Sequence, residues 1–70
     1  MTQRAIEINR NPQGTGVVAQ ILEDGTVIDT KSFKDRVSAI RFYENLAARR
    51  YMQYSWEVSG QFQATGKLGA

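Results

Sequence analysis

The chain has 70 residues, which is room for one small domain and excludes a second. It contains neither Cys nor His, which excludes a disulfide framework, a thiolate zinc site, a cysteine nucleophile and a histidine general base. Its net charge of +2 is too small to indicate a nucleic-acid ligand and has the wrong sign for a DNA mimic.

The first predicted element is a short strand over residues 4–8, with Ile6 and Ile8 on one face. Turn-forming residues follow from 9 to 16 and predict an exposed loop. The glycines of this loop fit the dinucleotide-binding pattern G-x-G-x-x-A, but they lead into a strand instead of a helix. We therefore interpret the segment as a loop without a nucleotide site.

A β-hairpin is predicted next, because β-rich runs at 17–23 and 26–33 flank Asp24-Gly25. Asp-Gly is the strongest short-range hairpin signal, since a type I′ turn needs positive φ at both central positions. A two-residue turn gives these cross-strand pairs: Ile21 with Ile28, Leu22 with Val27, Gln20 with Asp29 and Val18 with Lys31.

This register gives the hairpin one uncharged face and one mixed face. We expect the uncharged face to join the core; it carries Val17, Ala19, Ile21, Ile28, Thr30 and Ser32. The mixed face carries Val18, Leu22, Val27, Gln20, Asp29 and Lys31. A one-residue bulge at the turn would exchange the two faces, and this alternative stays open.

The hydrophobic period changes from two to 3.6 residues after Phe33, which predicts an amphipathic helix from the N-cap Asp35 to about Met52. Its apolar face groups Leu46, Ala39, Tyr43, Ala47, Ile40 and Tyr51, and its polar side carries Arg41, Glu44 and Arg49. Phe42 lies off the centre of the apolar face, so we expect it to be the most exposed aromatic residue.

Alternation returns from Ser55 to Gln63, which predicts a last strand whose Trp56 and Val58 face the helix. The remaining residues have little apolar bulk and predict a flexible C-terminal tail over 64–70, after a single domain over 1–63. The expected fold class is α+β, with a mostly antiparallel four-stranded sheet in the chain order β-β-β-α-β. One amphipathic helix packs on one face of this sheet.

A single helix covers only one face of such a sheet, so the other face is either solvated or a contact surface. We expect contact with a protein partner or with a second copy of this chain. The expected contact residues are Val18, Leu22 and Val27, helped by Arg41 and Arg49 on the helix and by Arg10 and Asn11 in the loop. A chain this short buries only about 60% of its unfolded surface, so a partner would add stability.

A nucleic-acid-binding module is the competing interpretation. Six of the nine basic residues lie between Lys31 and Arg50. In this interpretation phosphates are bound by Lys31, Lys34, Arg41 and Arg49.

No function as an enzyme is expected. The carboxylates form no pair that predicts acid–base catalysis, and Asp24-Gly25 lacks the alternating acidic ligands of a calcium loop. We therefore expect no catalytic residue, metal, cofactor or small-molecule substrate. No stretch approaches about 18 apolar residues, and residues 1–10 lack the apolar core of a signal peptide, so we expect a cytoplasmic protein without membrane contact.

Two family resemblances accompany these patterns. Asp24-Gly25 and the run from Phe33 to Phe42 resemble the arm-type DNA-binding domain of tyrosine recombinases, in which a Gly turn precedes Phe, a capping residue, Ala and an aromatic residue. In that family the sheet contacts DNA, which implies contacts from Gln20, Thr30 and Lys31.

The second resemblance covers more of the chain. The hairpin, a helix ending in Arg49-Arg50-Tyr51 and a closing strand with Trp56-Glu57-Val58 are similar to small bacteriophage host-takeover proteins, such as the inhibitor of bacterial RNA polymerase. Anti-CRISPR proteins of this size are a broader comparison class. The resemblance implies a phage or mobile-element protein that inhibits or regulates a larger assembly by stoichiometric docking.

Overall fold

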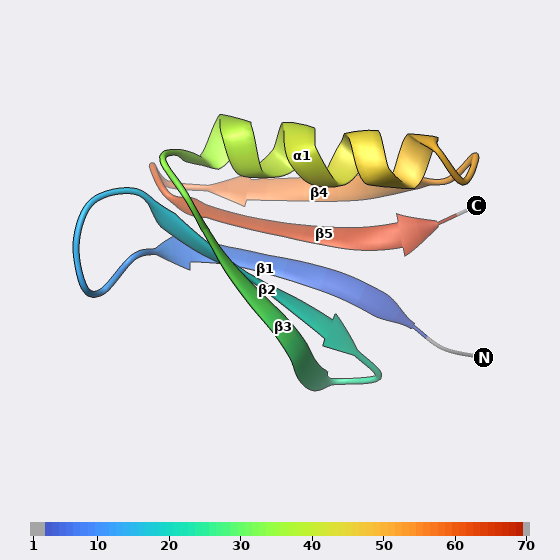
Figure 1. Ribbon diagram of the computed structural model, residues 1–70, viewed down its shortest axis with the longest axis horizontal. Coiled ribbons are helices and arrows are strands. Elements are labelled where there is room, and N and C mark those ends of the chain that lie inside the picture. The colour runs from blue at the N-terminus through green and yellow to red at the C-terminus, as the bar shows by residue number, and fades with distance from the viewer. Residues whose placement is uncertain (1–2, 70) are drawn as a thin grey trace.

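A computed structural model describes residues 3–69, which contain five strands and one helix. In chain order these are β1 (Arg4–Arg10), β2 (Val17–Glu23), β3 (Thr26–Phe33), α1 (Arg36–Ala48), β4 (Gln53–Ser59) and β5 (Gln63–Gly69). The strands form one antiparallel sheet in the spatial order β3-β2-β1-β5-β4 (Figure 1). The predicted α+β class is confirmed, but the sheet has five strands where four were expected.

The additional strand is β5, which lies where the flexible tail was expected. It pairs with β1 on one side and with β4 on the other. The chain reverses near Gly60, which has a positive φ of 59°, so the predicted single strand from Ser55 to Gln63 is wrong. The predicted tail is wrong for the same reason: residues 63–69 form β5, and Ala70 lies outside the described residues.

A small residue in β5 allows this strand to pack beside β4. Gly66 pairs with Trp56 of β4, and a Cβ atom built on Gly66 would lie only 2.6–2.9 Å from three atoms of the Trp56 ring. The indole therefore occupies the space that any side chain at this position would need. Low apolar bulk in β5 is thus a packing requirement and does not prevent the segment from forming a strand.

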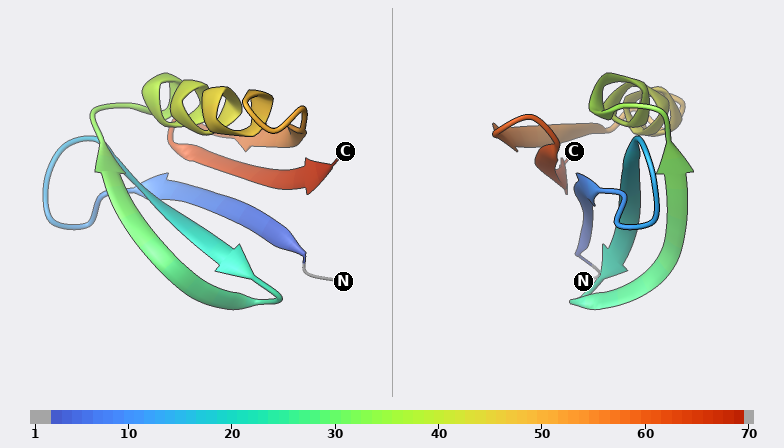
Figure 2. Two further views of the ribbon diagram at one scale, coloured as in Figure 1. Left: turned by 45° about the vertical axis from the view of Figure 1, so that its right-hand side comes forward. Right: turned by 90° about the vertical axis from the view of Figure 1, so that its left-hand side faces the viewer.

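Seen end-on, the strands form an arc with α1 on its inner side (Figure 2). The core lies there, and its buried cluster draws on β1, β2, β5 and α1: Ile6, Ile8, Val17, Ala19, Ala39, Tyr43 and Ala64. Burial raises the pKa of the Tyr43 phenol above its ordinary value. Two members of the predicted apolar helix face are instead exposed, since Leu46 is 44% and Tyr51 is 96% accessible.

The hairpin of β2 and β3 has the predicted turn but a different register. Asp24 and Gly25 have φ values of 50° and 85°, as a type I′ turn requires. Leu22 pairs with Val27 as predicted, whereas the next pair skips Ile28 and joins Ile21 to Asp29. Ile28 is thus left unpaired in a β-bulge two pairs beyond the turn.

The bulge shifts the alternation of β3 relative to that of β2. Thr30 and Ser32, predicted to face the core, pair with Gln20 and Val18 on the opposite face, while Lys31 pairs with the buried Ala19. The faces of β2 are as predicted. The predicted pairs that involve β3 beyond the bulge are wrong: Ile21 with Ile28, Gln20 with Asp29 and Val18 with Lys31.

The start of α1 is fixed at two points. The N-cap Asp35 is confirmed, because its carboxylate accepts a hydrogen bond of 2.8 Å from the backbone N–H of Ser38, and this hydrogen bonding lowers the pKa of the Asp35 carboxyl. Arg36 donates through Nη1 to the carbonyl oxygens of Gly60 and Gln63, each at 3.0 Å. The Arg36 guanidinium therefore ties the helix to the turn between β4 and β5.

The end of α1 lies at Ala48, before the predicted end near Met52. The backbone N–H of Met52 donates to Ala47 O at 3.0 Å, and that of Tyr51 donates to Ala48 O at 3.1 Å. These are the two hydrogen bonds of a Schellman motif, which usually places Gly at the residue with left-handed backbone angles. Here that residue is Tyr51, with a φ of 56°.

The contact between Gly66 and Trp56 predicts that Gly66→Ala lowers the free energy of unfolding by about 1–3 kcal/mol, because the new methyl group must displace the indole. Urea denaturation followed by circular dichroism measures the change. Gly14→Ala is the matched control, since Gly14 has no heavy atom within 4 Å of its would-be Cβ. Equal unfolding midpoints for the two variants would contradict the packing described here.

The conformation of Tyr51 predicts that Tyr51→Gly raises the free energy of unfolding by about 0.5–1 kcal/mol, because Gly adopts left-handed angles without a Cβ clash. Tyr51→Ala keeps the Cβ atom and therefore keeps the strain. Thermal and urea denaturation of the two variants test this difference. A gain of the same size for Ala and Gly would show that removal of the exposed ring is the cause.

Candidate functional site

The face of the sheet turned away from α1 is named the open face, and within residues 3–69 no helix or strand lies over it (Figure 2). Because Ile6, Ile8, Val17 and Ala19 are buried on the helix side, the intervening residues and their paired neighbours lie on the open face. These are Ala5, Glu7 and Asn9 in β1, Val18, Gln20 and Leu22 in β2, Val27, Thr30 and Ser32 in β3, Ser55, Glu57 and Ser59 in β4, and Gln63, Thr65 and Lys67 in β5.

Apolar side chains of the open face gather on β1, β2 and β3. Leu22 pairs with Ala5 on one side and with Val27 on the other, so the three lie in one row across the strands. Val18 lies on the same strand and face, four residues from Leu22, with Gln20 between them. Val27 is 46% exposed, and Val18 and Leu22 are half-buried. The structure thus places the three predicted apolar contact residues on one face.

A shallow hollow of about 460 Å³ adjoins this apolar strip, between the loop after β1 and the open-face residues Val18 and Thr30. Asn11 orders the loop: its backbone N–H donates to Gly16 O at 3.0 Å, and its side-chain oxygen accepts from the backbone N–H of Gln13 at 2.9 Å. The predicted contact residue Asn11 therefore lies beside Val18 in a folded loop.

Arg10, the other predicted contact residue of this region, also lines the hollow. Its guanidinium carbon lies 5.7 Å from the centroid of the Phe62 ring, within range of a cation–π interaction. Arg10 thus connects the first loop to the turn between β4 and β5.

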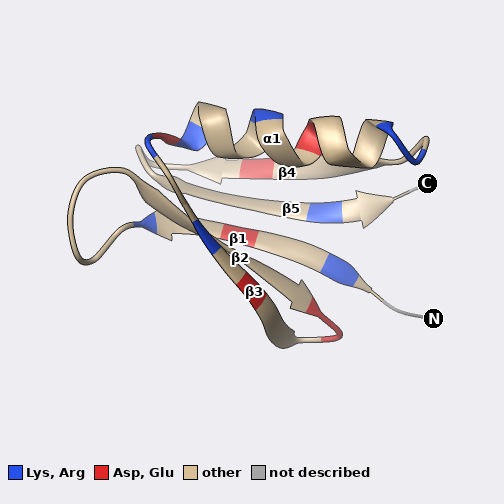
Figure 3. Ribbon diagram, in the orientation of Figure 1, with Lys and Arg blue, Asp and Glu red and all other residues tan. Residues whose placement is uncertain are grey.

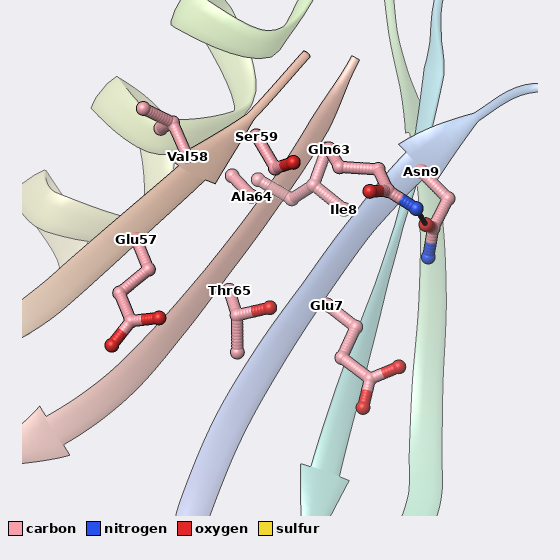
Figure 4. Close-up of a pocket in the computed structure, with 9 residues that line it drawn as sticks. All are labelled: Glu7, Ile8, Asn9, Glu57, Val58, Ser59, Gln63, Ala64 and Thr65. Atoms are coloured by element: carbon pink, nitrogen blue, oxygen red, sulfur yellow. Dashed lines mark hydrogen bonds between the residues drawn. The ribbon is translucent and has the colours of Figure 1, made fainter.

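The other half of the open face is acidic. Glu7 of β1 and Glu57 of β4 each pair with Thr65 of β5, and the three side chains extend from neighbouring strands on the same side of the sheet (Figure 4). They help to line a second hollow of about 380 Å³. The open face carries two carboxylates, those of Glu7 and Glu57, and one basic residue, Lys67. The net charge of this face is therefore negative. Across residues 3–69 no group of three Asp or Glu side chains gathers as a metal site would need.

Arg41 and Arg49 lie on the other side of the sheet. Arg41 is in α1 and Arg49 caps its C-terminal end (Figure 3). The sheet separates both from Val18, Leu22 and Val27, with which the sequence analysis grouped them. The structure therefore does not bring the full predicted contact set together on one surface.

Three of the four residues of the nucleic-acid interpretation lie around the first half of α1, and acidic side chains lie among them. Lys31 lies on the helix side of β3, where its Nζ is 4.4 Å from the centroid of the Phe42 ring. Lys34 lies in the connection from β3 to α1, and Arg41 and Arg49 are about 12 Å apart along the helix axis. Acidic residues lie among these cations in β3 and α1 (Figure 3), so they form no continuous basic stripe.

The open-face residues of β5, Thr65 and Lys67, were missed because the segment was expected to be a tail. Two signals in the sequence indicate the strand. Gly60 interrupts the alternation in the manner of a turn, and Ala64, Gly66 and Leu68 then recur at every second position.

Comparison of the chain with protein-family models, with curated proteins and with solved structures finds no match. The roles of its residues are therefore argued from the geometry alone. In the described part of the chain, no helix has the length and apolar character needed to cross a membrane.

Proposed function

We propose that this chain is a non-enzymatic protein-binding module that docks on a larger protein through its open face. One observation carries the proposal: Ala5, Leu22 and Val27 form an apolar strip on a face that no helix or strand covers within residues 3–69, and Val18 lies on the same face beyond Gln20. The solvated face of an antiparallel sheet is ordinarily polar by alternation. Apolar residues there favour a surface that a partner covers.

The charges beside the strip favour a protein partner over a nucleic acid. Glu7 and Glu57 lie on the same face, where they would repel phosphates. A complementary partner surface has an apolar patch next to Lys or Arg side chains, which would lie over these two carboxylates. The cations of the helix side point in the same direction, because Asp35 and Glu44 lie among Lys34, Arg41 and Arg49.

The resemblance to small bacteriophage host-takeover proteins accords with this function. Those proteins act by stoichiometric docking and have no active site of their own. We therefore propose that docking of this chain inhibits or regulates the assembly to which its partner belongs.

The test compares the wild-type chain with the double variant Leu22→Lys/Val27→Lys, which places two charges in the apolar strip. Tagged proteins are used to capture partners from lysate of the source cell, with and without nuclease treatment. The captured protein is then purified, and its affinity is measured by calorimetry. We expect a one-to-one complex that the double variant weakens at least tenfold, because desolvating two lysines opposite an apolar patch is costly.

Val37→Lys is the matched control, because Val37 is a 61% exposed apolar residue of α1 on the other side of the sheet. Circular dichroism and urea midpoints verify that all variants fold. Unchanged affinity of the double variant would overturn the proposal. So would capture that nuclease abolishes, or a mass from light scattering showing that the open face pairs with a second copy of the chain.

A further inference from the structure

A third hollow, of about 330 Å³, lies on the helix side of the sheet, where the C-terminal half of α1 passes over the strands. We name it the helix-end groove. Its floor is apolar and includes Ile21 of β2, Leu46 of α1 and Leu68 of β5. Its rim carries three guanidinium groups, those of Arg4, Arg49 and Arg50. The groove thus combines an apolar floor with a basic rim.

The positive charge of this rim exceeds the negative charge beside it. No carboxylate lines the groove, but two lie next to it: Glu23 Oε2 accepts from Arg4 Nη2 at 3.1 Å, and Asp29 of β3 pairs with Ile21 of the floor. Arg49 and Arg50 form no ion pair with any residue between 3 and 69. Both are exposed, so both guanidinium groups are free to bind an anionic group of a partner.

The backbone beside the groove supplies a second, independent observation. Tyr51 directly follows Arg50, is 96% exposed and has the left-handed angles for which Gly is favoured. No contact within the fold explains an aromatic residue at this position. Tyr and Arg are the residues that contribute most at protein interfaces, and local backbone strain concentrates at functional sites.

We propose that the helix-end groove binds an acidic segment of a protein partner. One large apolar side chain of the segment packs over Leu46 and Leu68, flanking carboxylates pair with Arg49 and Arg50, and Tyr51 packs against the segment from outside. The inference does not rest on the function proposed for the open face, because the two surfaces lie on opposite sides of the sheet.

The residues that line the helix-end groove favour a peptide ligand over a nucleic acid. Guanidinium groups bind carboxylates and phosphates alike, so the rim alone does not distinguish these anions. The aliphatic side chains of the floor favour a peptide, because Ile21, Leu46 and Leu68 pack against an apolar side chain and offer no ring on which a nucleobase would stack. A segment with Asp or Glu beside Leu, Ile, Phe or Trp uses both the rim and the floor.

The experiment selects binders from a displayed library of random 12-residue peptides on the immobilised full chain. The most enriched peptide is then synthesised with a fluorescent label, and its affinity is measured by anisotropy at 0.15 M salt. We expect enrichment of Asp and Glu next to one large apolar residue. Exchanging that apolar residue for Ala, or the acids for Asn and Gln, should weaken binding at least tenfold. Amide resonances of Ile21, Leu46 and Leu68 should shift on binding.

Variants of the chain then assign the site. Arg49→Ala/Arg50→Ala should weaken binding of the synthetic peptide at least tenfold, whereas Arg41→Ala, an arginine of α1 outside the groove, should leave it within twofold. Tyr51→Gly should weaken binding at least threefold, and it keeps the proposal testable if the double variant fails to fold. Leu22→Lys/Val27→Lys should bind the peptide normally, which separates this site from the open face.

Three results would overturn the inference. One is a selection without enrichment of acidic residues beside apolar ones. Another is peptide binding that survives both the arginine and the Tyr51 substitutions. The third is displacement of the peptide at 0.15 M salt by an equal concentration of a 12-nucleotide single-stranded RNA, which would assign the rim to nucleic acid.

Discussion

The pairing of β1 with β5 determines the rest of this fold. It places β3 at one edge of the sheet and β4 at the other, while α1 is the connection between those two edge strands. The chain must therefore pass from one edge to the other, and α1 does so across a single face. Only that face receives a core, and the other is left to solvent or to a partner. The open face is thus a consequence of strand order.

Sequence predicts those parts of the fold that a short local motif determines. The Asp24-Gly25 turn, the limits of β2 and β3 and the Asp35 cap each depend on a few neighbouring residues. The bulge at Ile28 has no such local signal, and beyond it Phe33 of β3 packs against Phe42 and Tyr43 of α1. No pattern within the hairpin itself contains that information. Strand β5 was missed because low apolar bulk was interpreted as a tail, whereas Gly66 is small because Trp56 on the adjacent strand fills the space beside it.

The candidate surfaces also contain residues that the sequence predicts and residues that only the fold reveals. Alternation along one strand is enough to place Val18 and Leu22 on the open face, but the neighbours Glu7, Thr65 and Lys67 follow only from strand order. The helix-end groove combines residues from all parts of the chain and has no signature in any one segment. The open face and the helix-end groove lie on opposite sides of the sheet, so the two proposed sites do not overlap.

Tyr51 also bears on how this chain changes over evolutionary time. A tyrosine codon becomes an asparagine codon by a single base change, and Asn tolerates left-handed backbone angles better than other residues with a Cβ atom. A lineage that no longer needed the aromatic ring would lose it readily and gain stability by doing so. The residue at position 51 in related chains would then serve as a record of selection: an aromatic side chain where binding is maintained, and Asn or Gly where it has been lost.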